Sequence, residues 1–259
     1  MENSLTKIVL ILEYDGTNYY GFQLQANRPD QPTIQSELEK AVYQLTGEAI
    51  RVLAASRTDT GVHAREQVVS FRTHSPLPAQ TFCSGLNHYL PGDIAVKSAH
   101  RVADSFNVRS DAISREYRYY ICNRATRPAI ERRFAYHVPQ HLDATAMDEA
   151  SRRLVGEHDL AAFTGTLAGR IKTVRRVYHS EVERKDDTVI FDITANSFLP
   201  HQIRNTMGAL IQVGLGRMKV RDFCAMMEAK KPASAGPRVP AHGLFLEKVN
   251  YTRPFGEEN

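Results

Sequence analysis

The chain has 259 residues and a mass of 29.2 kDa, enough for one large domain or two smaller ones. An apolar content of 42% and a charged content of 24% are typical of a soluble globular protein. The longest apolar run near the N-terminus covers only residues 8–12, which is too short for a signal peptide or a membrane helix. We expect a buried strand there instead.

The cysteines exclude two further classes of protein. Cys83, Cys122 and Cys224 are odd in number and far apart, so they cannot form a disulfide framework and match no zinc spacing. No pair of histidines has a convincing metal-ligand spacing either. The sequence therefore predicts no metal site and a location in the reducing cytoplasm.

The first part of the chain predicts elements in the order β-α-β-β-α-β, which is the ferredoxin-like pattern. They are a strand over 7–14, a helix between Thr33 and Gly47, strands over 50–55 and 67–72, a helix over 79–89 and a strand over 94–102. Thr33 is a preferred N-cap residue, and Gly47 suits the end of a helix. The inward faces of the two helices are expected to carry Ile34, Leu38, Ala41, Val42 and Leu45, and Phe82, Leu86 and Tyr89, respectively.

The second part repeats much of this order. We expect a strand over 115–123, a helix over 144–155, a hairpin of strands 174–184 and 188–195, helices over 201–213 and 220–229, and a last strand over 244–251. The fold class is therefore α+β, with two ferredoxin-like halves that form one extended mixed or antiparallel sheet with a central cleft. The predicted halves are 1–105, which carries an aspartate loop, and 106–259, which carries a tyrosine strand and an arginine helix.

The stretch from Arg57 to His63 is the first candidate functional site. Asp59 lies between two threonines on a tight connection between two expected strands, where a rigid scaffold can aim it outward. Gly61 supplies the backbone freedom that such a connection needs. An Asp-x-Gly turn with a capping aspartate would have the same sequence, although it would need neither Arg57 nor His63. The local sequence leaves both interpretations open.

Arginines concentrate between residues 101 and 133. They are Arg101, Arg109, Arg115, Arg118, Arg124, Arg127, Arg132 and Arg133. Four acidic residues and no lysine share this stretch, so it carries an excess of four positive charges, equal to the net charge of the whole chain. Tyr117, Tyr119 and Tyr120 are interleaved with the arginines. A solvated surface explains most charge runs, but arginine mixed with aromatic residues favours nucleic acid, and RNA in particular.

Two residues of the second half are candidates for an active site with Asp59. Tyr117 begins the first strand of that half, where a tyrosine is most often a core residue. Arg204 lies between the inward Ile203 and Met207 in a helix with no other charged side chain, so it must be paired if it points into the cleft. Asp59 is the natural partner, although spacing alone does not establish the contact.

Five motifs in order along the chain resemble the TruA-type tRNA pseudouridine synthases. Ser56 to Ala64 resembles the family signature Gly-Arg-Thr-Asp-Ala-Gly-Val-His-Ala. The other four are Tyr14-Asp15-Gly16-Thr17 with Tyr20-Gly21-Phe22-Gln23, Arg115-Glu116-Tyr117-Arg118-Tyr119, Phe198 to Asn205, and Ala241 to Leu246. The family usually has Trp at Phe22, Gly at Ser56 and Ala at Thr60. None of these departures removes a proposed catalytic group.

The resemblance implies isomerisation of uridine to pseudouridine at positions 38–40 of the tRNA anticodon arm, without cofactor or metal, by a homodimer. By similarity Asp59 is the catalytic carboxylate, as a nucleophile or as a base at the sugar. Arg204 pairs with it, Tyr117 stacks on the uracil, Arg57 holds the target base out of its stem, and Leu244 walls the pocket. We further expect Arg109 and Arg124 to bind RNA phosphates.

Two other functions fit parts of the sequence. A non-catalytic RNA-binding protein with paired ferredoxin-like domains would use the same arginines but would not need Asp59. A metal-dependent phosphohydrolase would need clustered carboxylates, and the acidic residue nearest to Asp59 in the sequence is Glu66.

Overall fold

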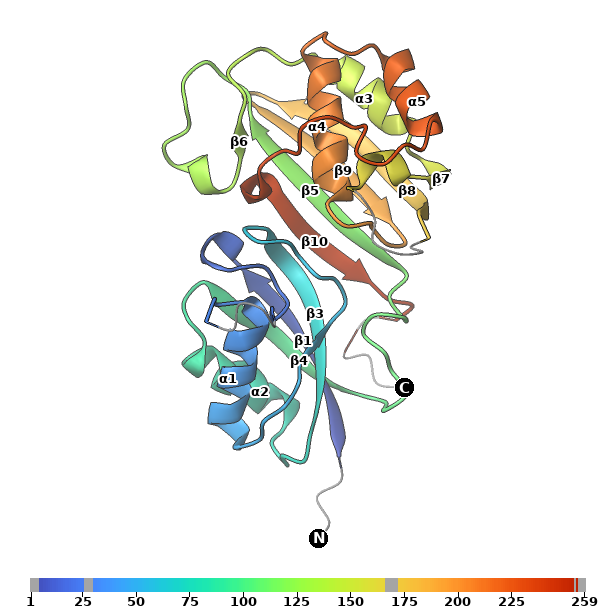
Figure 1. Cartoon of the computed structure of the whole chain (residues 1–259). Helices are drawn as coiled ribbons and strands as arrows, with labels where there is room; N and C mark the ends of the chain where they lie inside the picture. Colours follow the sequence, from blue (N-terminus) through green and yellow to red (C-terminus); the bar gives the residue numbers. More distant parts are fainter. Residues whose placement is uncertain (1–4, 26–29, 166–171, 254, 256–259) are drawn as a thin grey trace. The chain divides into compact units, whose positions relative to one another are not determined.

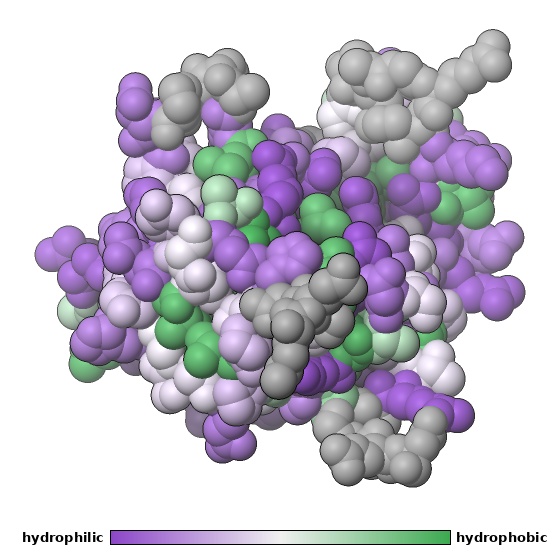
Figure 2. Space-filling view, turned by 90° about the horizontal axis from the view of Figure 1, so that it is seen from below, coloured by the Kyte–Doolittle hydropathy of each residue, from purple (hydrophilic) through white to green (hydrophobic). Residues whose placement is uncertain are grey.

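The computed structural model describes residues 5–25, 30–165, 172–253 and 255. The chain divides into two compact units, one made of Met1–Arg115 and Leu246–Asn259 and the other of Glu116–Phe245. Figure 1 follows the chain through the elements of each unit. The face seen in Figure 2 is mostly hydrophilic, with small separate hydrophobic patches. In the described segments no helix is both long enough and apolar enough to cross a membrane.

The first unit has the predicted β-α-β-β-α-β order. Its elements are β1 (Thr6–Tyr14), α1 (Ile34–Thr46), β2 (Leu53–Ala54), β3 (His63–Thr73), α2 (Ala79–Tyr89) and β4 (Ile94–Val102). The strand order is β4-β1-β3, with β2 paired to β3, and every one of these pairs is antiparallel. Both faces of β1 are covered, because the consecutive residues Ile8, Val9 and Leu10 are all fully buried.

Helix α1 begins and ends where the sequence predicts. The Thr33 hydroxyl accepts a hydrogen bond from the backbone N–H of Ser36, and Ser36 accepts one from the backbone of Thr33. Gly47 follows the helix in the left-handed conformation, at φ 75°. Leu45 lies against Gly85 of α2, where a Cβ atom would come within 2.7 Å of Leu45 Cδ1. The two helices of this unit therefore pack closely.

Three details of the first unit differ from the prediction. Strand β3 covers His63–Thr73 and thus begins directly after the Asp59 turn, rather than at residue 67. Strand β2 covers 53–54 rather than 50–55, because the backbone of Val52 is bonded to helix α1: its N–H donates to Glu39 and its carbonyl accepts from Gln35. Tyr89 is 45% exposed rather than inward. Leu90 is buried in its place, since it lies four residues after Leu86 on the same side of the helix.

The second unit contains the remaining elements. They are β5 (Ser114–Cys122), β6 (Tyr136–His137), α3 (Ala144–Arg152), β7 (Gly156–Asp159), β8 (Val174–Lys185), β9 (Thr188–Ala195), α4 (Gln202–Gly214), α5 (Val220–Glu228) and β10 (Leu244–Asn250). The strand order is β5-β9-β8-β7, and β6 pairs in parallel with β5. Strands β5 and β10 run across the unit boundaries at Arg115 and Phe245. The α+β class with a mixed, mainly antiparallel sheet is confirmed; β6 and β7 are short strands that the sequence did not predict.

The units group the chain differently from the halves 1–105 and 106–259. Residues 106–115 and 246–259 belong to the first unit. The reason is local pairing: the N–H of Ile113 donates to the carbonyl of Asn250, and Tyr251 Oη donates to the carbonyl of Val108. The assignment of functional roles to the two halves remains a prediction.

Candidate active site

Asp59 begins a tight turn that precedes β3. The backbone N–H of Val62 donates to the carbonyl of Asp59 at 3.1 Å, which closes the turn Asp59–Val62. Gly61 has φ 76°, the conformation that the third residue of a type II turn requires. Asp59 is partly exposed, whereas Arg57 and Thr60 are fully in the exposed class. The turn thus brings a carboxylate and a guanidinium group to the surface of the first unit.

A buried hydrogen-bond network supports this loop from below. Tyr14 Oη and Thr58 Oγ1 share a hydrogen bond of 2.8 Å, which links β1 to the residue before Asp59. Gln67 Nε2, from β3, donates to Tyr14 Oη at 3.3 Å and to the carbonyl of Ser56 at 2.7 Å. The N–H of Ser56 donates back to Gln67 Oε1. Tyr14, Thr58 and Gln67 are at most 6% exposed, so the network is desolvated and rigid.

The opening motif, residues 14–23, holds the loop from the side. The N–H of Phe22 donates to the carbonyl of Thr58 at 3.0 Å, and the N–H of Gly61 donates to the carbonyl of Tyr19 at 3.3 Å. Gly21 has φ 86°, and a Cβ atom there would lie 2.8 Å from the carbonyl oxygen of Thr58. A glycine is therefore required at this close approach. The motif that resembles the family's opening sequence serves to position the aspartate loop.

His63 completes this support. Its ring is 1% exposed, and Nδ1 accepts a hydrogen bond from the backbone N–H of Gly16. The same nitrogen lies 3.1 Å from Asp15 Oδ1. A Cβ atom at Gly16 would come within 2.1 Å of the carbonyl oxygen of Val62. The histidine of the motif is thus a buried structural residue at the start of β3.

Arg57 and Arg109, which the sequence assigns separately to substrate and RNA, line one pocket of the first unit. Arg124 is in the second unit, where Nε donates to the carbonyl of Thr126 and Nη1 lies 3.7 Å from Asp187 Oδ2. Asp187 therefore partly compensates the charge of Arg124, which makes Arg124 less suited to binding a phosphate.

Tyr117 lies on β5 in the second unit and is 6% exposed. Its ring packs edge-to-face against Phe198, with centroids 5.2 Å apart and an interplanar angle of 82°. Phe198 opens the motif that leads into α4. The tyrosine strand thereby contacts the segment that precedes the arginine helix, within the second unit.

Arg204 is fixed at the start of α4. Its Nε donates to the carbonyl of Val239 at 2.9 Å, and the N–H of Val239 lies 3.4 Å from the carbonyl of Arg204. Tyr119 Oη donates to the next carbonyl, that of Pro240. Burial raises the pKa of Tyr119 above its ordinary value, so its hydroxyl stays protonated as a donor. The segment 239–240 therefore orients the guanidinium group.

The last motif packs on β5 beside this segment. Gly243 approaches β5 so closely that a Cβ atom would lie 2.8 Å from both the ring of Tyr119 and the carbonyl oxygen of Tyr120. Leu244, the next residue, is 5% exposed. Burial lowers the pKa of His242, and the nearby charge of Arg204 lowers it further, against a backbone hydrogen bond that raises it. His242 is accordingly neutral near pH 7.

Sequence reasoning missed the supporting residues. The sequence predicts Gln67 only as the start of a strand, and Arg115 only as a member of the arginine-rich stretch and of one motif. A glutamine directly before the apolar pair Val68 and Val69 of a strand is a detectable signal, because a buried polar side chain must find partners. Nothing in the local sequence identifies its partners Tyr14 and Ser56. Asp59 and Arg57 belong to the first unit, while Tyr117, Arg204 and Leu244 belong to the second.

The chain matches the family model described as tRNA pseudouridine synthase over residues 10–111 and 150–252. Three relatives carry the name tRNA pseudouridine synthase A. That of Thermoanaerobacter sp. (strain X514) is 38% identical over 95% of this chain and 100% of its own length. The relative from Exiguobacterium sp. is 39% identical over 96% of this chain and 99% of its own length. The relative from Haemophilus ducreyi is 40% identical over 96% of this chain and 95% of its own length.

Among solved structures, an archaeal box H/ACA sRNP Nop10-Cbf5 complex aligns with 79% of this chain and 43% of its own chain. The sequence identity is 10% and the TM-score 0.33.

The network beneath the loop generates a test that is independent of activity. Tyr14→Phe removes the hydroxyl that joins Thr58 to Gln67, and leaves both partners buried with a lost bond. We expect a loss of stability of about 1–3 kcal/mol. We also expect faster hydrogen exchange at the Gly61 and Val62 amides, measured by mass spectrometry alongside denaturant unfolding.

Tyr43→Phe is the matched control, because Tyr43 lies on α1 and is 55% exposed. It should change neither the unfolding midpoint nor the exchange of the loop. Equal behaviour of the two variants would show that the Tyr14 hydroxyl does not hold the loop.

Proposed function

We propose how this chain, which belongs to the tRNA pseudouridine synthase family and isomerises uridine to pseudouridine in tRNA, performs that reaction. Asp59 is the carboxylate that starts it. The main support for this role is the structure of the loop 57–63. Asp59 is the only acidic residue of this loop, it is partly exposed, and its turn is supported by buried hydrogen bonds. Such a support fixes the position of a reactive group.

The reaction defines what Asp59 must do. The N1–C1′ bond of uridine breaks, the uracil turns, C5 bonds to C1′, and the proton on C5 leaves while N1 gains one. A carboxylate can attack C1′, forming an ester that C5 later displaces, or it can remove a proton from the sugar. Both routes need an ionised carboxylate at the ribose, and neither needs a metal or a cofactor.

The second unit contributes the other proposed groups. Arg204 pairs with the Asp59 carboxylate; its fork suits a bidentate bond, and its orientation through Val239 supports this role. Tyr117 stacks on the uracil and moves the C5 proton, and its packing on Phe198 supports a fixed ring. Leu244 forms an apolar wall of the base pocket, consistent with its burial.

The substrate and assembly are also proposals. Similarity to the family suggests positions 38–40 of the anticodon arm as targets, a homodimer as the working form, and the cytoplasm as the location. Arg57 holds the target base outside its stem, for which its exposed position in the loop is suitable. Arg109 binds an RNA phosphate. The same role for Arg124 stays a prediction, because Asp187 already partly compensates its charge. A non-catalytic RNA-binding protein is disfavoured, because the full-length relatives are named as synthases.

Asp59→Asn tests the mechanism directly. The turn is closed by the main chain of Asp59 rather than by its side chain, so the fold and tRNA binding should survive, at a cost of roughly 1 kcal/mol or less. An amide cannot act as the nucleophile or the base, so tritium release from tRNA labelled at uracil C5 should be undetectable.

Asp186→Asn is the matched control for this substitution. Asp186 is in the β8–β9 hairpin at φ 52°, a conformation that asparagine also tolerates. We expect wild-type tritium release and an unchanged melting temperature. Turnover by Asp59→Asn near the wild-type rate would rule out the carboxylate mechanism.

Tyr117→Phe separates stacking from proton transfer. It keeps the ring and its contact with Phe198 but removes the hydroxyl. If the hydroxyl moves the C5 proton, kcat should fall by roughly 100-fold or more while tRNA affinity stays within about twofold. The measurement is single-turnover tritium release with parallel tRNA binding.

Tyr178→Phe, on β8 and 47% exposed, controls for the loss of a tyrosine hydroxyl. It should leave both quantities unchanged. An undiminished rate in Tyr117→Phe would restrict Tyr117 to stacking.

A further inference from the structure

A pocket of about 190 Å³ adjoins the aspartate loop in the first unit. Its floor contains the buried Phe22 and Val108. Three exposed arginines line it: Arg51 before β2, Arg57 of the loop, and Arg109 of the segment after β4. Arg51 and Arg57 lie six residues apart before β3, and Arg109 is more than fifty residues further along the chain, so the fold brings it to the same pocket.

The three arginines around this pocket form no ion pair within the described part of the chain. Among the described residues no acidic side chain lines the pocket, and Glu39, which accepts hydrogen bonds from the lining residues Gln35 and Val52, forms no ion pair with the three arginines. Among the described residues, no carboxylate forms an ion pair with Arg51, Arg57 or Arg109. Three like charges around a small pocket repel one another, which an anion would relieve.

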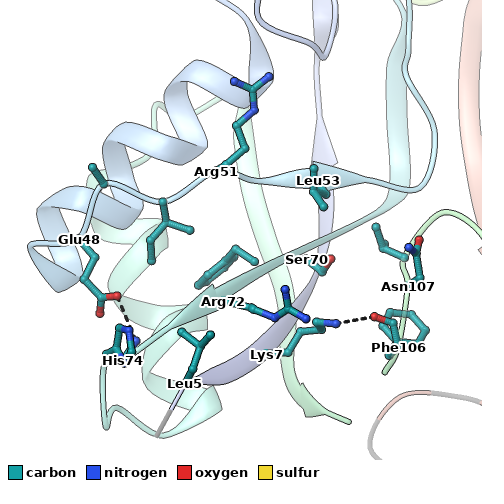
Figure 3. A pocket seen from close by; sticks show the side chains of 14 residues that line it. Leu5, Lys7, Glu48, Arg51, Leu53, Ser70, Arg72, His74, Phe106 and Asn107 are labelled. Atoms are coloured by element: carbon teal, nitrogen blue, oxygen red, sulfur yellow. Dashed lines mark hydrogen bonds between the residues drawn. The ribbon is translucent and has the colours of Figure 1, made fainter. Parts of the chain in front are cut away.

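The neighbouring pocket, of about 480 Å³, provides a contrast (Figure 3). Lys7 and Arg72 line it, but both interact with Asp104, at 3.8 and 2.6 Å. Arg51 lines both pockets, and in Figure 3 its side chain extends away from Lys7 and Arg72. In the larger pocket Lys7 and Arg72 are thus paired with Asp104, whereas Arg51, Arg57 and Arg109 around the smaller pocket have no ion pair among the described residues.

The backbone of Arg109 is fixed in relation to the aspartate loop. Its N–H donates to Asn107 Oδ1 at 3.0 Å, and its carbonyl accepts from Nη2 of Arg115 at 2.8 Å. The same Arg115 nitrogen donates to the carbonyl of Ala55, at the start of the loop, at 3.1 Å. Arg115 is only 7% exposed, so a buried guanidinium group joins the two walls of the pocket. The site is preorganised rather than a chance gathering of surface arginines.

Size and chemistry indicate the ligand. The volume is below the roughly 300 Å³ at which pockets for drug-sized ligands begin. Planar guanidinium forks suit phosphate oxygens, and the family's substrate carries one phosphate per nucleotide. Arg57 is two residues from Asp59, a separation of at most about 7 Å along the backbone. An anion in this pocket would therefore lie close to the reacting nucleotide.

We propose that this pocket binds one phosphodiester group of the RNA backbone near the target uridine, with Arg51 and Arg109 as ligands to the same phosphate. The proposal rests on the proposed function, and it adds Arg51, which no sequence motif identifies. It also assigns Arg109 to one defined phosphate, which it shares with Arg51, instead of a general attraction to RNA.

Phosphate-ethylation interference on whole tRNA tests this directly. Ethylation neutralises single phosphates, and those that matter for binding are depleted in the bound fraction. Ethylation of one particular phosphate should weaken binding to the wild type. Ethylation of that same phosphate should no longer matter for Arg51→Ala or for Arg109→Ala. Each variant should bind tRNA roughly tenfold more weakly or worse, and the double variant should lose less than the product of the two effects.

Arg153→Ala is the control, because it removes the same charge from the exposed end of α3. It should change affinity less than twofold and leave the interference pattern intact. The shared site would be overturned if the two variants lost interference at two different phosphates. It would also be overturned if both bound tRNA more weakly but kept the wild-type interference pattern. Tritium release by the wild type and by Asp59→Asn, measured on the same tRNA, shows separately whether the catalytic proposal holds.

Discussion

The position of Asp59 depends on hydrogen bonds between its loop and buried side chains of two strands. Tyr14 on β1 and Gln67 on β3 meet under the loop and bond to Thr58 and Ser56. A loop with few apolar contacts would otherwise be among the least stable parts of the unit. The ferredoxin-like core thus transmits its rigidity to an exposed carboxylate through polar contacts, which are directional in a way that apolar packing is not.

Much of the fold follows from local sequence signals. The N-cap at Thr33, the glycine at Gly47 and the alternation of buried and partly exposed residues in β5 act within a few residues, so the sequence identifies these elements. Predictions fail where a backbone group bonds to a residue far away in the sequence instead of to a neighbouring strand. The backbone of Val52 bonds to side chains of α1, so a strand predicted over 50–55 is reduced to two residues.

The candidate site was predictable only in part, for the same reason. Asp59, Arg57, Tyr117 and Arg204 belong to motifs, and motif recognition finds them. The residues that support them work through long-range backbone contacts that no spacing reveals. Arg115 is an example: it bonds to carbonyls of Ala55 and Arg109, respectively 60 and 6 residues away. Within an arginine-rich stretch, nothing distinguishes this buried arginine from its exposed neighbours until the fold is known.

The departures from the usual family sequence fit this division of labour. Ser56 stands where the family has glycine, and both its bonds to Gln67 use the main chain. Phe22 stands in place of tryptophan, and it holds the loop through its backbone N–H while an aromatic ring still fills the core. Thr60 replaces alanine at an exposed turn position. The three departures thus leave the main-chain bonds of the loop in place, and the family motifs retain Tyr14 and Thr58, whose side chains hold the catalytic loop.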